Sequence, residues 1–155
     1  LINARSETAH EKPSFRNALA HRRCIIPASG FFEWKKVENR TQPYYIYMTG
    51  NTLMPFAGLW ESWKSPEGIT LETCTILTTT ANAMISSIHA RMPVILHQDE
   101  FSPWLNREIT DPSKLVPLFS PYPADQVQCY PVSSLVNNPT HDGPECILQA
   151  SGEEG

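Results

Sequence analysis

Alternating apolar and polar positions, together with runs of β-branched residues, predict a chain built mainly of strands. The predicted strands cover residues 1–8, 24–26, 31–37, 42–48, 54–63, 72–81, 92–97 and 127–133. Turn-forming pairs separate some of them, since Ser29-Gly30 precedes one strand and Gly50-Asn51 follows another. Neighbouring strands joined by short turns indicate a meander.

Helical spacing of apolar residues is confined to short segments. Phe15, Ala18 and Leu19 follow the start signals Pro13 and Ser14, which predicts one short helix. Other short helices are predicted at residues 81–89, 99–106 and 111–119, a loop at 137–145 and a disordered tail at 151–155. The predicted fold class is therefore α+β, with a curved, mostly antiparallel, barrel-like sheet and short flanking helices.

The first predicted strand places two polar side chains on one surface. In "LINARSET", alternation puts Asn3 and Arg5 on one face and Ile2 and Ala4 on the other. Two strong hydrogen-bonding groups then point the same way, which makes this strand a candidate for part of a binding site.

Composition describes one ordinary globular domain, which we place at residues 1–150. The chain has 155 residues, of which 41% are hydrophobic and 18% charged, and its net charge is −4. Residues 1–40 hold eight Lys/Arg and four Asp/Glu, a local charge of +4, whereas the rest holds four and twelve, a local charge of −8. An anionic partner is expected at the basic end, although chance clustering on a solvated face explains the same numbers.

Several function classes lack their motifs in this sequence. No apolar run approaches the roughly 18 residues of a membrane span, and no signal-peptide pattern occurs, so we expect a soluble intracellular protein without a membrane partner. The four cysteines form no C-x-x-C and are expected to be reduced thiols. The histidines show no ligand spacing, so no metal is expected. Motifs of P-loop, G-x-S-x-G and dinucleotide-binding proteins do not occur either.

Two side chains are candidates for proton transfer. Glu33 lies between Phe32 and Trp34, and burial against aromatic rings raises the pKa of a carboxyl group toward the range useful in acid–base catalysis. The alternative is an edge-strand Glu paired with a neighbouring lysine. His89 ends a predicted helix, where the dipole favours its charged form, or it simply caps that helix.

Trp34 and Cys24 also have both a functional and a structural interpretation. Exposed tryptophans beside basic residues stack on unpaired bases, and Trp34 is our candidate for this role, although most tryptophans in such a domain are core residues. Cys24 follows two arginines, which would lower its thiol pKa if it were exposed. Because two isoleucines follow it, a buried strand cysteine is the preferred interpretation.

Seven segments taken in order resemble one protein family along nearly the whole chain. They are "NARSET", "RRCIIPASGFFEWKK", "QPYYIY", "FAGLWESW", "TILTTTAN", "IHARMPVIL" and "PVSSLVNNPTHDGPE". On these motifs the chain resembles the SRAP family of SOS response-associated peptidases, which includes abasic-site processing proteins.

The resemblance implies a sensor of abasic sites in single-stranded DNA that becomes covalently linked to them. In the family, a cysteine directly after the initiator Met is freed by removal of that Met, in part by self-cleavage, and traps the sugar aldehyde as a thiazolidine. By motif match Asn3 would position or activate this cysteine, while Glu33 and His89 would manage protons. Arg5 and Arg91 would hold DNA phosphates, and Thr78 matches a further position beside the DNA.

The resemblance further implies a thiol autopeptidase with abasic-site crosslinking or lyase-type activity. It implies no cofactor, a monomer, and a cytoplasmic, nucleoid-associated location if the source is bacterial. The sequence starts inside the family's domain, so we expect the Met-Cys-Gly segment, in roughly the missing first third, to precede Leu1. Two alternatives stay open: a noncatalytic module that binds single-stranded or branched DNA, and a thiol peptidase acting on other proteins.

Overall fold

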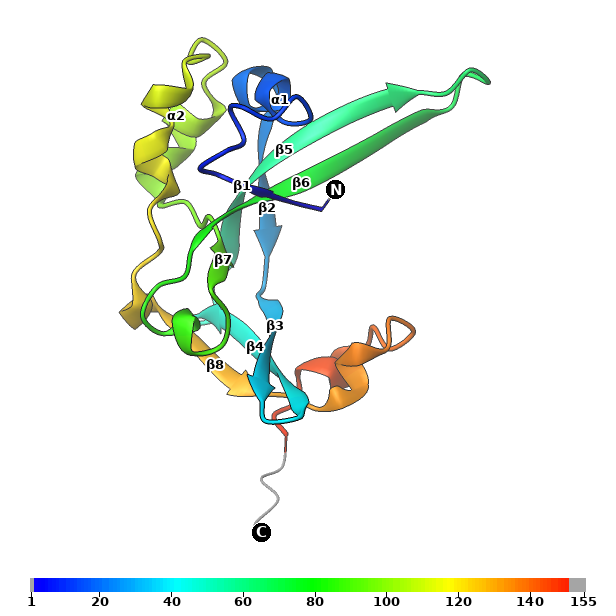
Figure 1. The fold of residues 1–155 in the computed structure, drawn as a ribbon, viewed down its shortest axis with the longest axis vertical. Coiled ribbons are helices and arrows are strands. Elements are labelled where there is room, and N and C mark those ends of the chain that lie inside the picture. The colour runs from blue at the N-terminus through cyan, green and yellow to red at the C-terminus, as the bar shows by residue number, and fades with distance from the viewer. Residues whose placement is uncertain (1, 151–155) are drawn as a thin grey trace.

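Strands dominate the computed structural model, which describes residues 2–150 (Figure 1). The strands are β1 (Asn3–Arg5), β2 (Arg23–Ala28), β3 (Phe31–Val37), β4 (Arg40–Met48), β5 (Met54–Lys64), β6 (Thr70–Thr80), β7 (Arg91–Pro93) and β8 (Val127–Pro131). Two short α-helices, α1 (Arg16–His21) and α2 (Phe101–Leu105), accompany them. The 3₁₀ turns are Ile85–Ser87, Gln98–Glu100, Pro112–Lys114, Val116–Phe119, Ala124–Gln126, Ser134–Asn137 and Pro144–Ile147. The predicted α+β class, mostly antiparallel with short helices, is confirmed.

The strands are divided between two sheets that do not close into a barrel. The larger sheet has the order β1-β6-β5-β2, with β7 also paired to β6, and the smaller has the order β3-β4-β8. All these pairs are antiparallel except β1 with β6, which is parallel. The hydrophobic pattern predicts where strands lie but not which strands pair, so the second sheet was not anticipated.

The larger sheet opens where β5 and β6 diverge, and β7 enters between them. The Val94 backbone N–H donates to the Leu77 carbonyl at 2.8 Å, and the Val94 carbonyl accepts from the Ala57 N–H at 2.9 Å. Toward their other ends β5 and β6 continue as a long two-stranded arm that projects from the body (Figure 1). Residues of β6 beside the opening are therefore bordered by both β1 and β7.

A close backbone approach joins the two sheets at Gly30, between β2 and β3. A Cβ atom at this position would lie 2.5 Å from the Ile46 carbonyl oxygen and 2.6 Å from the Tyr45 ring. Only glycine fits there without a shift of β4. The turn predicted at Ser29-Gly30 is thus the link that carries the chain from the larger sheet to the smaller one.

Two apolar clusters support these sheets. The first lies among β1, β5, β6 and the helices and includes Leu19, Leu59, Leu77, Leu96 and Trp104. The second lies among β4, β5, β7 and the turn before β7 and includes Ile46, Met54, Ile85, Met92 and Ile95. Both clusters place fully buried side chains behind strands whose other faces carry polar groups, which holds those groups in fixed positions.

Several predicted elements are shorter than expected. The helix predicted at 81–89 is only the 3₁₀ turn Ile85–Ser87, because the buried Asn82 amide organises this segment by accepting from the Ile85 N–H at 2.9 Å and donating to the Tyr122 carbonyl at 2.7 Å. The helix predicted at 111–119 is two 3₁₀ turns, since Pro117 has no N–H to continue an α-helix.

Other boundaries also differ from the sequence-based prediction. The strand predicted at 1–8 reduces to β1, and the one at 92–97 reduces to β7 and a single bridge between Ile95 and Phe56. The loop predicted at 137–145 ends in a 3₁₀ turn that starts at Pro144. The tail predicted at 151–155 lies outside the described residues.

Candidate functional site

A cleft of about 420 Å³ lies between the two sheets. The larger sheet contributes side chains from β1, β5, β6 and β7, the smaller sheet contributes β3, and the segment before β7 contributes one histidine. Its polar lining consists of Asn3, Arg5, Glu33, Thr78, His89 and Arg91. All catalytic candidates and all proposed DNA contacts except Trp34 therefore meet in one place.

Strand β1 aims Asn3 and Arg5 into the cleft by simple alternation. Ala4 is 3% exposed and belongs to the core, whereas its two neighbours are exposed. The predicted face is thus confirmed for Asn3 and Arg5, although Ile2, which alternation places on the face of Ala4, is exposed. Within residues 2–150 the Arg5 guanidinium has no hydrogen-bond or ion-pair partner, so its donors remain available to a ligand.

Glu33 reaches the cleft from β3 and is partly withdrawn from water. Its side chain is 23% exposed, and Phe31 and Phe32 line the cleft beside it. Burial raises the pKa of Glu33 above its ordinary value, while the nearby His89 and the Trp34 backbone N–H oppose this effect. The expected elevated carboxyl pKa is confirmed in direction, and the pairing with a neighbouring lysine is not what the structure shows.

His89 faces Glu33 across the cleft and is held by the chain that follows it. Its Nδ1 lies 3.7 Å from Glu33 Oε1 and 3.1 Å from both the backbone nitrogen and the carbonyl oxygen of Arg91. When the Arg91 N–H donates to Nδ1, the neutral ring carries its proton on Nε2. When Nδ1 also carries a proton, it can donate to the Arg91 carbonyl or to Glu33. The ring therefore has hydrogen-bond partners both with and without this proton. The helix-dipole argument for His89 was wrong, because the preceding turn is too short to be a helix.

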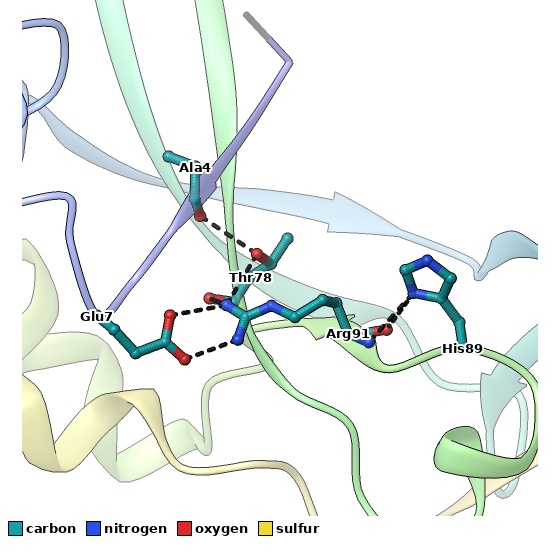
Figure 2. A network of polar contacts seen from close by, with 5 residues as sticks. All are labelled: Ala4, Glu7, Thr78, His89 and Arg91. Atoms are coloured by element: carbon teal, nitrogen blue, oxygen red, sulfur yellow. Dashed lines mark hydrogen bonds and ion pairs between the residues drawn. The ribbon is translucent and has the colours of Figure 1, made fainter.

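Arg91 is engaged by the protein itself, as Figure 2 shows. Its Nη1 and Nη2 donate to the two carboxylate oxygens of Glu7 at 2.7 and 2.8 Å, and Nη2 also donates to the Thr78 carbonyl at 2.7 Å and to Thr78 Oγ1 at 3.2 Å. The Thr78 hydroxyl donates in turn to the Ala4 carbonyl at 3.4 Å. The guanidinium expected to hold phosphate is thus part of the wall of the cleft.

Trp34 lies on β3 next to Glu33 but points to the other face of the strand, outside the cleft lining. It is 38% exposed, and its Nε1 donates to Asn137 Oδ1 at 2.6 Å. The ring remains accessible on the surface beside the cleft, anchored at its polar edge.

The basic residues before Cys24 have structural duties. Arg23 donates to the carbonyls of Trp104, Leu19 and Ala20, and Arg22 forms an ion pair with Glu61 at 2.6 Å. Cys24 lies on β2, as the sequence favoured, but it is only half-buried; this burial raises the pKa of its thiol. Trp104 is fully buried, which agrees with the expectation that some tryptophans belong to the core.

Sequence reasoning missed Glu7. It lies within the "NARSET" motif, but an acidic residue in a turn gives no signal of its partner until β1 and β7 both pair with β6, one on each side of it. The aromatic side chain of Phe56, which also lines the cleft from β5, was missed for the same reason.

Residues 2–150 contain neither a metal-binding cluster of side chains nor a membrane-spanning helix. In this part of the chain no three His, Cys, Asp or Glu side chains are grouped so that they could hold a metal ion. None of its helices has the length and apolar character needed to cross a membrane.

These observations define a mixed α+β protein with a polar cleft between two open sheets. A model of the SOS response associated peptidase (SRAP) family matches residues 1–139, and the chain belongs to this family. It is 51% identical over 148 residues to abasic site processing protein YoqW of Bacillus subtilis, and 32% identical over 176 aligned positions to abasic site processing protein HMCES of Rattus norvegicus. A solved structure of a protein from Bacteroides thetaiotaomicron superimposes with a TM-score of 0.87 and is 32% identical in sequence. The alignment covers 96% of this chain and 66% of that protein.

The chain is shorter than these relatives. It aligns over 95% of its own length with YoqW but spans only 66% of that protein, and over 96% with HMCES but spans only 49% of it.

Proposed function

We propose that the protein processes abasic sites in single-stranded DNA, with residues 1–150 forming the part of the SRAP domain that holds the DNA and transfers protons. The observation that carries the proposal is the meeting of Asn3, Arg5, Glu33 and His89 in one cleft. The chain matches the SRAP family model, and the curated relatives YoqW and HMCES are named abasic site processing proteins.

The cleft suits the first step of such a reaction, the opening of the abasic sugar. The ring form is a hemiacetal, so opening requires removal of the proton on the C1′ hydroxyl and delivery of a proton to the ring oxygen. Glu33, with its raised carboxyl pKa, would donate the proton, and His89 would accept one. With Glu33 and His89 3.7 Å apart, the proton taken up by His89 could pass back to Glu33 after the sugar ring has opened.

The covalent step uses a cysteine at the N-terminus of the whole protein. Its amine condenses with the C1′ aldehyde, which releases one water, and its thiol then adds to the resulting imine to close a thiazolidine. The same cysteine would be freed by removal of the initiator Met, with Asn3 positioning it. No redox step is needed, because an aldehyde and an aminothiol give the ring and water.

Binding would rest mainly on Arg5 and on aromatic surface. The Arg5 guanidinium is free within the described residues, and an arginine contact to phosphate gives affinity without sequence preference. Trp34 would stack on an unpaired base next to the cleft.

The test is an adduct assay with the full-length protein. A single-stranded oligonucleotide with one abasic site should yield a species of reduced mobility that survives denaturation, and an oligonucleotide without the site should not. Binding without any such species would instead favour the noncatalytic DNA-binding module. Intact-mass measurement of the purified protein checks the removal of Met.

A further inference from the structure

Glu7 occupies an unusual place for an acidic residue in a site proposed to bind DNA. It follows β1 directly, after Arg5 and Ser6, and both its carboxylate oxygens accept from the Arg91 guanidinium. The pair is bidentate, which fixes the plane of the guanidinium as well as its distance. The pKa of Glu7 is lowered, chiefly by this hydrogen bond, so the carboxylate stays ionised at neutral pH.

The guanidinium held by Glu7 also contacts Thr78 of β6. Its Nη2 donates to the carbonyl and to the hydroxyl of Thr78, and this carbonyl also accepts from the Ser6 N–H at 2.9 Å. The side chain of Arg91 is only 19% exposed, and its Nε is buried without a hydrogen-bond partner among residues 2–150. Because this donor is unsatisfied, the stability of the buried guanidinium depends strongly on its hydrogen bonds to Glu7 and Thr78.

The main chain of the same residue holds the catalytic histidine. The Arg91 N–H and carbonyl both lie 3.1 Å from His89 Nδ1, so the position of Arg91 decides the position of the imidazole. Figure 2 shows the whole series, in which Glu7 and His89 lie on opposite sides of Arg91. The contacts thus run from the end of β1 to the proton-transfer pair.

We infer that Glu7 is a positioning residue for the proposed reaction, acting through Arg91 on Thr78 and His89. This inference rests on the proposed function. Glu7 does not line the cleft; it holds the Arg91 guanidinium and offsets its charge, whereas the Arg5 guanidinium makes no hydrogen bond or ion pair among residues 2–150 and interacts with Glu7 only through its charge.

Removal of Glu7 should affect DNA affinity and the rate of the covalent step in different directions. This difference separates a positioning role of Glu7 from a merely electrostatic one. Removing a carboxylate beside a DNA-binding cleft should tighten binding, because repulsion of phosphate is lost. If the His89 ring is held less firmly, the covalent step should be slower, because displacing a reacting group by about 1 Å strongly reduces the rate. A positioning residue therefore gives tighter or equal binding together with slower chemistry.

The experiment compares full-length wild-type protein with Glu7→Gln, using single-stranded DNA with one abasic site. At saturating DNA the crosslinking rate of Glu7→Gln should fall about tenfold, while the DNA concentration for half-maximal rate stays equal or falls. Glu11→Gln is the matched control, since Glu11 carries the same charge in the same segment and is exposed; its rate should equal that of the wild type. In the Arg91→Met background the Glu7→Gln change should cost less than about twofold, because the partner is already gone.

A spectroscopic measurement keeps the inference testable without the reaction. Nitrogen NMR of the histidine rings, assigned with His89→Asn, should show the Nε2–H form of His89 in the wild type and a mixture of forms in Glu7→Gln. If the wild-type protein forms no adduct, the proposed function fails, and the ring spectrum alone decides the role of Glu7. Equal rates for Glu7→Gln and Glu11→Gln, or an unchanged ring spectrum, would overturn the inference while leaving the proposed function intact.

Discussion

Glu33 Oε1 lies 3.7 Å from His89 Nδ1, although the two residues come from different sheets. Glu33 belongs to the smaller sheet, and His89 precedes β7 of the larger sheet. The cleft is therefore assembled by the packing of two sheets and not by one loop. Burial of Glu33 from the smaller sheet raises its pKa, and the Arg91 backbone of the larger sheet orients the imidazole. Any change that moves one sheet relative to the other should separate the pair.

Replacement of Glu33 by Gln should abolish most of the chemistry and leave binding intact. Gln keeps the size and hydrogen-bonding ability of the side chain but cannot donate the carboxyl proton. We expect the crosslinking rate at saturating DNA to fall by about 10²–10⁴-fold, the usual contribution of a positioned acid or base. The measurement is single-turnover adduct formation, with Kd determined separately on DNA without an abasic site; an unchanged rate would exclude the proton-transfer role.

The raised pKa of Glu33 also predicts the direction of the pH dependence. If the protonated carboxyl donates to the sugar oxygen, the rate is highest below this pKa and falls as the pH rises through it. Burial moves that limb to higher pH than an exposed glutamate would give. The check is the pH–rate profile of crosslinking, in which Glu33→Gln should remove the limb; a limb that persists in this variant belongs to another group.

The local arrangement of these candidates was predictable from the sequence, whereas their meeting was not. Alternation alone placed Asn3 and Arg5 on one face, because side chains in a strand alternate regardless of the rest of the fold. The site as a whole rested on the family resemblance, since Asn3, Glu33 and His89 are far apart in sequence.

Errors occurred where tertiary contacts override local pattern. The Asn82 side-chain amide donates to the Tyr122 carbonyl and accepts from the Ile85 N–H. A single turn therefore replaces the helix expected before His89. The ion pair between Glu7 and Arg91 depends on β1 and β7 pairing with the same end of β6, which no local pattern specifies.

Loss of Arg5 should weaken DNA binding without a specific effect on chemistry. An unpaired guanidinium in the cleft is expected to contact one phosphate, so Arg5→Ala should raise Kd and reduce the slope of log Kd against log salt by about one. Arg16→Ala is the matched control, because Arg16 is exposed on α1 and does not line the cleft. Equal salt slopes for the two variants would remove Arg5 from the interface.

Arg23 should prove to be a stabilising residue that DNA does not use. Its guanidinium satisfies carbonyl groups at the end of α1 and at Trp104, and its charge lies over the Trp104 ring at 5.5 Å. Arg23→Met keeps the aliphatic part and leaves these acceptors without their donor, at a cost of about 1–3 kcal/mol. Urea unfolding should show the loss, while the crosslinking rate of folded protein stays at the wild-type value; a rate that falls in parallel would assign Arg23 to the site.

Trp34 and Trp63 offer a matched pair for testing base stacking, because both are exposed tryptophans on strands but only Trp34 follows a residue that lines the cleft, Glu33. Trp34→Ala should weaken binding of single-stranded DNA by about 1–3 kcal/mol, the contribution of one stacked base. Trp34→Phe keeps a ring but loses the hydrogen bond to Asn137, so it should retain most of the affinity. Trp63→Ala, on the projecting part of β5, should bind like the wild type (Figure 1). Fluorescence anisotropy with a short labelled oligonucleotide measures all three, and equal losses for both alanine variants would show that the interface extends along the arm and is not confined to the cleft.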